Sequence, residues 1–199
     1  MKKIEVVLIL GAVLGILFFV LNYPFGAIIT IISLLTLSCI YFYFGFALFN
    51  RVQFLDIFKK SSFTGISTVS ILGAIGAGVA LSIVLVGILF KIFRWPFASQ
   101  NLLIGGIMIS VISIFSFVRF LKNGKRVYKE ILVRSLLFGS ICGVLLFQPN
   151  YLFIELKYSD YPDYIEALKK SEADPDNVIL QNKEQEEYDK MKEQWMVNK

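Results

Sequence analysis

The chain of 199 residues lacks histidine altogether and has only two cysteines, Cys39 and Cys142, both inside apolar runs. Zinc sites, haem sites and acid–base catalysis draw mainly on histidine or on cysteines at ligand spacing. The sequence therefore predicts neither a metal nor a cofactor. It also contains no nucleophile–base pair, so we expect no enzymatic activity. The two cysteines are expected to be small buried hydrophobes rather than a disulfide.

Acidic residues are nearly absent from the first two thirds of the chain. Between Glu5 and Glu130 the only carboxylate is Asp56. The loops up to residue 134 are basic and the tail from residue 155 onward is acidic, so the net charge of +5 is the sum of two opposite regions. A basic pI of this origin does not indicate nucleic-acid binding, and we expect no nucleic-acid partner.

Long uncharged runs are what this sequence has in abundance. Hydrophobic residues make up 56% of it and the mean hydropathy is +0.68, whereas soluble domains are usually about 45–50% apolar. A helix of roughly 20 apolar residues crosses a bilayer, and we expect five such spans at residues 4–21, 25–49, 63–90, 100–120 and 131–147. Because the runs do not alternate, the sequence predicts an all-α, multi-pass membrane protein, with the lipid bilayer as its first partner. A signal peptide is the alternative for residues 4–21, although no small-x-small cleavage site follows.

Lysine and arginine are distributed unevenly over the two sides of the expected bundle. The turns after the first and third spans carry only Lys91 and Arg94. The other side carries ten: Lys2, Lys3, Arg51, Lys59, Lys60, Arg119, Lys122, Lys125, Arg126 and Lys129. By the positive-inside rule we expect a bacterial inner-membrane protein with a cytoplasmic N-terminus and, after five spans, a periplasmic tail. Arg134 makes the fifth span the weakest, and the tail is cytoplasmic if that span does not cross.

Residues 15–26, GILFFVLNYPFG, resemble residues 87–98, GILFKIFRWPFA, at an offset of 72 positions. Both stretches lie between two apolar runs, so we interpret residues 4–49 and 63–121 as two related helical hairpins. The transmembrane domain then covers residues 1–150, with the fifth span after the hairpins, and residues 151–199 form an acidic soluble helical tail. A chance match is the alternative, because the chain is rich in phenylalanine and isoleucine.

The charged residues and the Trp-Pro pair of the second copy have two interpretations. Trp95 belongs at headgroup level, and Pro96 can begin the following helix at its first position. In one interpretation Lys91 and Arg94, three residues apart on one helical face, extend to the same membrane interface. In the other, Lys91 is an intramembrane charge that faces the helix bundle and has a function.

The stretch GILFKIFRWPFASQNLLIGG resembles the helical hairpin of the inner-membrane motor subunit of bacterial gliding motility and type 9 secretion, over about 40 of the 199 residues. Smaller relatives of unknown role share this pattern. In that family a lysine and a glutamate of the next helix form a proton-responsive pair. Lys91 matches the lysine, but Ile109 or Ser110 stands near the glutamate position. Because the sequence offers no intramembrane carboxylate or histidine, the resemblance implies a relative in hairpin design and not a motor.

Small residues in the expected spans indicate close helix contacts. Gly139 and Gly143 form a GxxxG pair in the fifth span, a spacing that lets two helix backbones approach each other. We expect this pair to pack within the chain. A contact between copies of the protein, giving a homo-oligomer, is the alternative.

The tail contains two helix starts, Asp160-Tyr161-Pro162 and Asp174-Pro175, recognised by capping and first-position proline. In the second tail helix Tyr188, Met191 and Trp195 line one stripe. The stripe either rests on the membrane or the first tail helix, or it docks a partner subunit with Trp195 as the anchor.

These features favour a non-catalytic function. We expect a structural or assembly subunit of a bacterial inner-membrane complex, of the gliding or type 9 secretion kind, whose tail binds a protein partner. A small homo-oligomeric transporter or channel is the alternative. It needs a polar path, for which the sequence offers little beyond serine, threonine, Lys91, Arg119 and Arg134.

Overall fold

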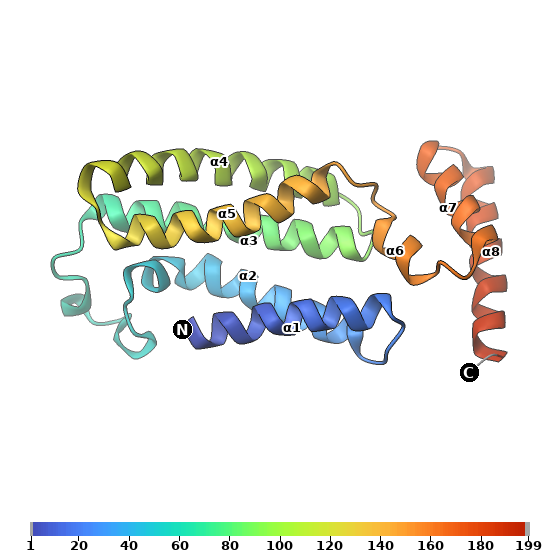
Figure 1. Cartoon of the computed structure of the whole chain (residues 1–199), viewed down its shortest axis with the longest axis horizontal. Helices are drawn as coiled ribbons and strands as arrows, with labels where there is room; N and C mark the ends of the chain where they lie inside the picture. The colour runs from blue at the N-terminus through green and yellow to red at the C-terminus, as the bar shows by residue number, and fades with distance from the viewer. Residues whose placement is uncertain (1, 198–199) are drawn as a thin grey trace.

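The computed structural model describes residues 2–197, which fold into helices joined by turns. Figure 1 shows the long helices side by side, with α7 and α8 packed together at one end and running roughly across them. The helices are α1 (Lys2–Val20), α2 (Gly26–Asn50), α3 (Thr68–Ile92), α4 (Ala98–Asn123), α5 (Arg126–Leu146), α6 (Leu152–Lys157), α7 (Pro162–Ala173) and α8 (Val178–Val197). Two 3-10 turns, η1 (Phe54–Asp56) and η2 (Lys60–Phe63), lie between α2 and α3.

The bundle has two different ends. The end with η1, η2 and the α4–α5 turn is called the loop end. The opposite end holds the α1–α2 and α3–α4 turns and helices α6 to α8, and is called the tail end.

Helix α3 lies at the centre of the bundle. It packs against α2, α4 and α5, whereas α1 packs mainly against α2. Leu81, Leu85 and Leu89 of α3 are fully buried, and its glycines and alanines are largely buried as well. A helix that is apolar all round is suited to this inner position. By contrast, α4 exposes a row of aliphatic side chains on its outer side: Ile104, Ile107, Val111 and Ile114.

Within residues 2–197, four helices, α1 to α4, are long and apolar enough to cross a membrane. Their exposed apolar side chains are those expected of a surface that faces lipid. The chain is therefore a helical membrane protein, as the sequence predicts. Helix α5 is 21 residues long and lies outside this set, because its first half carries Arg126, Lys129, Glu130 and Arg134.

The third helix begins later than the sequence predicts. Hydropathy alone places its start at residue 63, but residues up to Phe63 form η2 and the helix starts at Thr68. The Ser67 side chain accepts a hydrogen bond from the backbone N–H of Ser70 at 3.3 Å. This serine cap satisfies a free N–H of the first turn and fixes the start of the helix.

Helices α2 and α3 approach most closely where two glycines meet. A Cβ atom on Gly78 would lie 2.3 Å from the carbonyl oxygen of Tyr41 and 3.3 Å from Cα of Gly45. Backbone atoms cannot move away as a flexible side chain can. Only glycine therefore fits at this position.

We expect Gly78→Val to destabilise the bundle by about 1–3 kcal/mol or more, because the added side chain forces α2 and α3 apart. The measurement is the midpoint of thermal unfolding in detergent. Gly143→Val is the matched control, since no atom lies within 4 Å of a Cβ at that position. A control variant as unstable as Gly78→Val would contradict the packing explanation.

Candidate functional site

The two turns at the tail end have the same backbone conformation. Asn22 and Arg94, which are 72 residues apart, have φ angles of 58° and 53°. The N–H of Tyr23 donates to the carbonyl of Phe18 at 2.9 Å, and that of Trp95 donates to the carbonyl of Phe90 at 2.8 Å. Each turn therefore ends its first helix with a left-handed residue that satisfies free carbonyl groups.

Proline does not begin the second helix of either hairpin, contrary to the expectation for Pro96. Phe97 has a φ of 64° and stands between Pro96 and the first residue of α4, Ala98. Phe25 has the same φ and the same place after Pro24. The proline thus lies outside the helix, where its fixed φ shapes the turn.

Helix packing in the two hairpins is also alike. A Cβ on Gly15 would lie 2.7 Å from the backbone nitrogen of Thr30, and one on Gly87 would lie 2.9 Å from that of Leu102. Thr30 and Leu102 are again 72 residues apart. The two hairpins therefore share a turn conformation and a helix contact at positions that are 72 residues apart.

Lys91 is buried near the end of α3, with 1% of its surface exposed. Its Nζ donates to Oδ1 of Asn150 at 2.9 Å, and the Ser99 hydroxyl donates to the same oxygen at 3.1 Å. Asn150 lies in the segment between α5 and α6. The ammonium group of Lys91 is therefore directed at Asn150 within the chain. Its hydrogen bond to Asn150 connects the end of α3 to the segment between α5 and α6.

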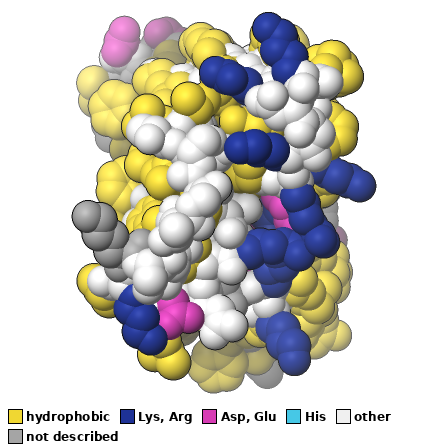
Figure 2. Space-filling view, turned by 90° about the vertical axis from the view of Figure 1, so that its left-hand side faces the viewer, with side chains coloured by type: hydrophobic (Ala, Val, Ile, Leu, Met, Phe, Trp, Pro, Cys, Tyr) yellow, Lys and Arg dark blue, Asp and Glu magenta, His cyan; other side chains and the backbone are white. Residues whose placement is uncertain are grey.

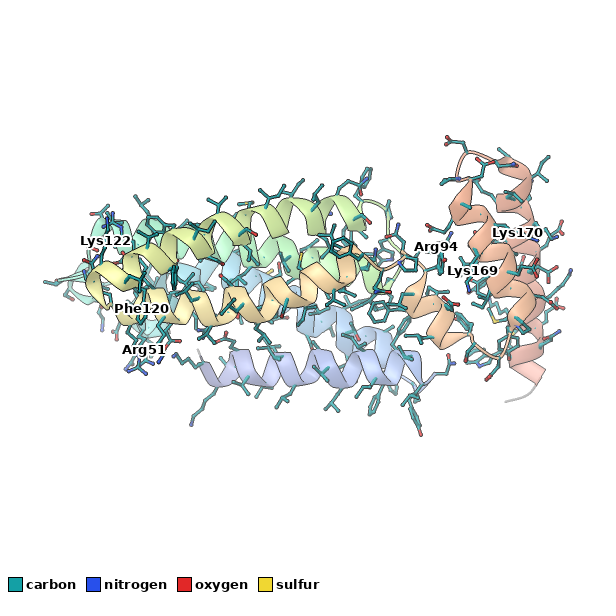
Figure 3. All side chains as sticks on the ribbon, turned by 45° about the horizontal axis from the view of Figure 1, so that its top comes forward. Arg51, Arg94, Phe120, Lys122, Lys169 and Lys170 are labelled. Carbon is teal, nitrogen blue, oxygen red and sulfur yellow. The ribbon has the colours of Figure 1, made fainter. Side chains whose placement is uncertain are left out.

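Arg94 lies beyond the end of α3, so it does not share a helical face with Lys91. Its Nε donates to Glu172 of α7 at 2.8 Å, and its two Nη atoms contact both carboxylate oxygens of Glu184 of α8. Figure 3 shows Arg94 in the gap between the bundle and the tail helices. Burial acts to lower the pKa of the guanidinium, but the hydrogen bonds to Glu184 and Glu172 outweigh it and raise the pKa. A forked donor set of this kind holds two carboxylates in fixed places.

The corresponding positions of the first hairpin also contact the tail. Phe19 stands where the second hairpin has Lys91, and the ammonium group of Lys157 lies 4.2 Å from the centre of its ring. Asn22 stands at the position of Arg94, and its Nδ2 donates to the carbonyl of Lys157 at 2.8 Å. Burial of the Lys157 ammonium lowers its pKa. The first hairpin thus holds the end of α6.

We call these two turns and their four contacting side chains the tail dock: Phe19, Asn22, Lys91 and Arg94. It consists of equivalent positions of the two hairpins, and each pair receives a different part of the segment after α5. No family model, curated protein or solved structure matches the chain. The arrangement of the tail dock is therefore argued from its own contacts.

Trp95, next to Arg94, packs within its own turn. Its ring lies 5.4 Å from that of Phe90 and 5.6 Å from that of Phe93, and the residue is 41% exposed. An aromatic ring that is half packed and half exposed beside the end of an apolar helix is typical of a membrane interface.

The two tail helices begin at different signals. Pro162 is the first residue of α7, as predicted. Helix α8, however, begins at Val178 rather than at Asp174-Pro175, because Oδ1 of Asn177 accepts the N–H groups of Ile179 and Leu180 at 3.1 and 3.4 Å. Asparagine is among the best residues for this role, and it moves the start of the helix.

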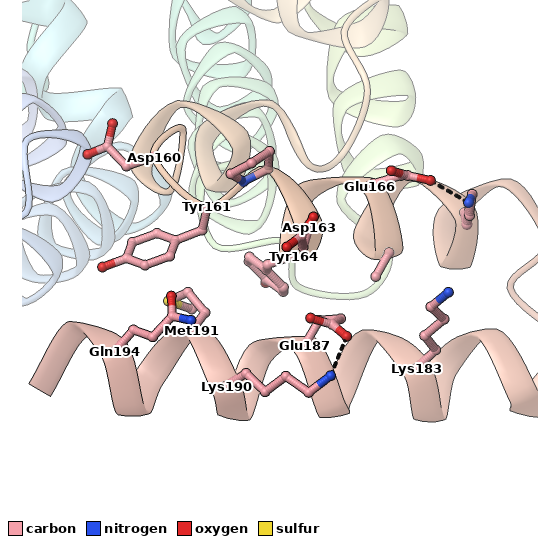
Figure 4. A pocket seen from close by; sticks show the side chains of 13 residues that line it. Asp160, Tyr161, Asp163, Tyr164, Glu166, Lys183, Glu187, Lys190, Met191 and Gln194 are labelled. Carbon is pink, nitrogen blue, oxygen red and sulfur yellow. Dashed lines mark hydrogen bonds and ion pairs between the residues drawn. The ribbon is translucent and has the colours of Figure 1, made fainter. Parts of the chain in front are cut away.

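The predicted stripe of α8 faces α7. Met191 is buried and Tyr188 partly buried in a small apolar cluster with Tyr164, Ile165 and Leu168 of α7. Trp195 continues this stripe and is half-buried. Figure 4 shows the cleft beside this contact, with a volume of about 390 Å³.

The cleft is lined by charges of both signs. Lys170 pairs with Glu166 at 2.5 Å and Lys190 with Glu187 at 2.7 Å. Paired charges of this kind are typical of a solvated helix surface. Within residues 2–197, no three possible metal ligands come together.

The structure brings together a second charged cluster, at the loop end, that the sequence did not indicate. Glu5 of α1 is 4% exposed and accepts the Tyr41 hydroxyl at 2.5 Å. Arg134 of α5 binds both oxygens of the same carboxylate at 2.6 Å. Glu5 is thus a carboxylate buried among membrane helices, which corrects the expectation that the chain has none.

Glu130 extends this cluster toward solvent. It accepts from Lys2 at 2.6 Å, from Arg51 at 2.7 Å and from Arg134 at 2.8 Å. The cluster therefore connects α1, α2 and α5 through their charges. The signals that could have pointed to it are Arg134, inside the fifth apolar run, and Glu5, at the start of the first, which lie 129 positions apart.

Gly139 and Gly143 have different surroundings. A Cβ on Gly139 would lie 3.2 Å from Ile109 of α4, whereas Gly143 has open space in front of it. The first glycine serves packing within the chain. The second is free of such contact.

Proposed function

We propose that the protein is a non-catalytic structural or assembly subunit of a bacterial inner-membrane complex, and that the hairpin of α7 and α8 binds its protein partner. The observation that carries this proposal is the contact of Arg94 with Glu172 and Glu184. It fixes both tail helices against the bundle, so the hairpin is presented in one orientation. A preorganised surface loses less entropy on binding than a mobile one.

The face of α8 that points away from α7 is the one available to a partner. Glu186, Asp189 and Glu193 recur on it at helical spacing and are all exposed. Tyr188 and Met191 lie on the opposite side of the helix, against α7. A partner with a basic surface is complementary to this acidic row.

The same proposal includes the membrane topology. Helix α5 serves as the fifth span, with Arg134 neutralised by Glu5, so that the N-terminus and the loop end are cytoplasmic and the tail is periplasmic. The resemblance of residues 87–106 to the motor-subunit hairpin adds the expectation that the complex belongs to gliding motility or type 9 secretion.

The experiment is purification of the tagged full-length protein from its host in mild detergent, with mass spectrometry of what accompanies it. We expect a partner in fixed ratio, and its loss from the triple variant Glu186→Lys/Asp189→Lys/Glu193→Lys. The variant Asp160→Lys/Asp176→Lys reverses exposed tail charges elsewhere and should keep the partner. A homo-oligomer without any partner would contradict the proposal and favour a transporter or channel.

A further inference from the structure

The loop end carries cations without counter-ions. Lys122, Lys125 and Lys129 are exposed around the α4–α5 turn, and no salt bridge joins them to a carboxylate of the described residues. Figure 2 shows this end of the molecule with lysine and arginine side chains spread over it. The acidic groups at this end among the described residues, Glu5, Asp56 and Glu130, are already occupied by other cations.

The tail end differs in this respect. Arg94 has Glu172 and Glu184, and three exposed lysines of the tail, Lys169, Lys170 and Lys190, each have a glutamate partner at 2.5–2.7 Å. Two others, Lys183 and Lys192, have no salt bridge among the described residues, but they lie on α8 next to Glu184 and Glu193. The lysines of the α4–α5 turn differ from these in having Glu130 as their one carboxylate nearby in the sequence, and Glu130 is already paired with other cations. The positive charge of the three lysines favours the binding of an anion from outside the chain.

Two apolar side chains at the same end point to where that anion comes from. Leu55 is 82% exposed and Phe58 is 93% exposed, in the loop that contains η1. Apolar side chains that are this exposed beside a membrane helix bundle are removed from water when they enter the boundary between lipid headgroups and acyl chains. The lysines are then at the level of the lipid phosphates.

From this juxtaposition we infer that the loop end is a binding site for anionic phospholipid. Lys122, Lys125 and Lys129 bind the phosphate-bearing headgroup, and Leu55 and Phe58 enter the same leaflet. The site recognises a lipid and not free phosphate, because the apolar part contributes to it. It is independent of the partner proposed for the tail.

The test is native mass spectrometry of the full-length protein from micelles that contain equal amounts of phosphatidylglycerol and phosphatidylcholine. We expect preferential retention of phosphatidylglycerol. Each lysine near an anionic surface strengthens binding about fivefold, so Lys122→Gln/Lys125→Gln/Lys129→Gln should weaken retention about 100-fold. The matched control Lys169→Gln/Lys170→Gln/Lys190→Gln should retain the lipid as wild type does.

Two further measurements distinguish binding of a lipid from binding of free phosphate. Phe58→Asn keeps the charge and should still reduce retention severalfold, whereas millimolar inorganic phosphate should not displace the lipid. Equal retention by wild type and the α4–α5 lysine variant would overturn the site. Displacement by free phosphate, or an unchanged Phe58→Asn, would overturn its assignment to a lipid. Thermal unfolding of each variant verifies that the bundle is intact.

Discussion

Arg134→Met is expected to destabilise the bundle strongly. Methionine fills much of the space of arginine, but it leaves the Glu5 carboxylate buried without its bidentate partner. Removing one member of a buried ion pair costs about 3–5 kcal/mol, because the remaining charge keeps its desolvation penalty. The measurement is the midpoint of unfolding in detergent, by heat or by denaturant.

A double-mutant cycle separates the pair from the rest of the cluster. Glu5→Gln/Arg134→Met removes both charges and should recover most of the stability lost in Arg134→Met. Arg126→Met is the matched control on the same helix, since this arginine is 69% exposed and lies 3.6 Å from Glu130; it should change stability by less than about 0.5 kcal/mol. An additive double mutant would mean that Glu5 and Arg134 do not stabilise the bundle through each other.

The helices and the class of protein could be predicted from the sequence because hydropathy is a local property. Runs of apolar residues gave the cores of α1 to α4 to within a few positions at most ends. The predicted helix starts were wrong where a single capping side chain determines the boundary. Ser67 caps α3 and Asn177 caps α8, so both helices begin later in the chain than predicted. In the hairpin turns Phe25 and Phe97 adopt left-handed φ, a conformation that the presence of proline does not indicate.

The tail dock could be predicted only in part. The repeat identified Lys91 and Arg94 as candidate residues. Their hydrogen-bond partners, however, lie 59 to 90 positions further along the chain, and the tail contains many glutamates. Sequence separation does not determine which glutamate contacts a given arginine in the folded protein. Glu5 was missed for a related reason: it stands next to Lys2 and Lys3 and so resembles a residue of the solvated flank, until packing of α1 against α2 places Tyr41 beside it.

Arg94→Glu is expected to release the hairpin of α7 and α8 from the bundle. The substitution removes the contacts to Glu172 and Glu184 and places a third carboxylate between them. All three side chains are no more than 25% exposed, so the repulsion is only partly screened. Two charge-assisted contacts of this burial together contribute about 3 kcal/mol, which corresponds to roughly a 100-fold change in the ratio of docked to released tail.

The release is measured as the distance between spin labels at Asn101→Cys, a half-buried position on α4, and Asp189→Cys, an exposed position on α8. The background is Cys39→Ala, because Cys39 is exposed and Cys142 is buried. We expect one narrow distance distribution for the wild-type sequence and a broad one for Arg94→Glu. Lys169→Glu, which removes an exposed pair with Glu155, is the control and should keep the narrow distribution.

Restoring the opposite charge makes the test specific for the ion pairs. Glu172→Lys/Glu184→Lys in the Arg94→Glu background should return the narrow distribution, because the attraction is re-formed with reversed signs. Helix α6 stays in place in every variant, since Phe153 and Ile154 pack against the bundle core. The hinge is then the segment between α6 and α7. A narrow distribution in Arg94→Glu would mean that apolar contacts alone hold the tail and that Arg94 does not determine its orientation.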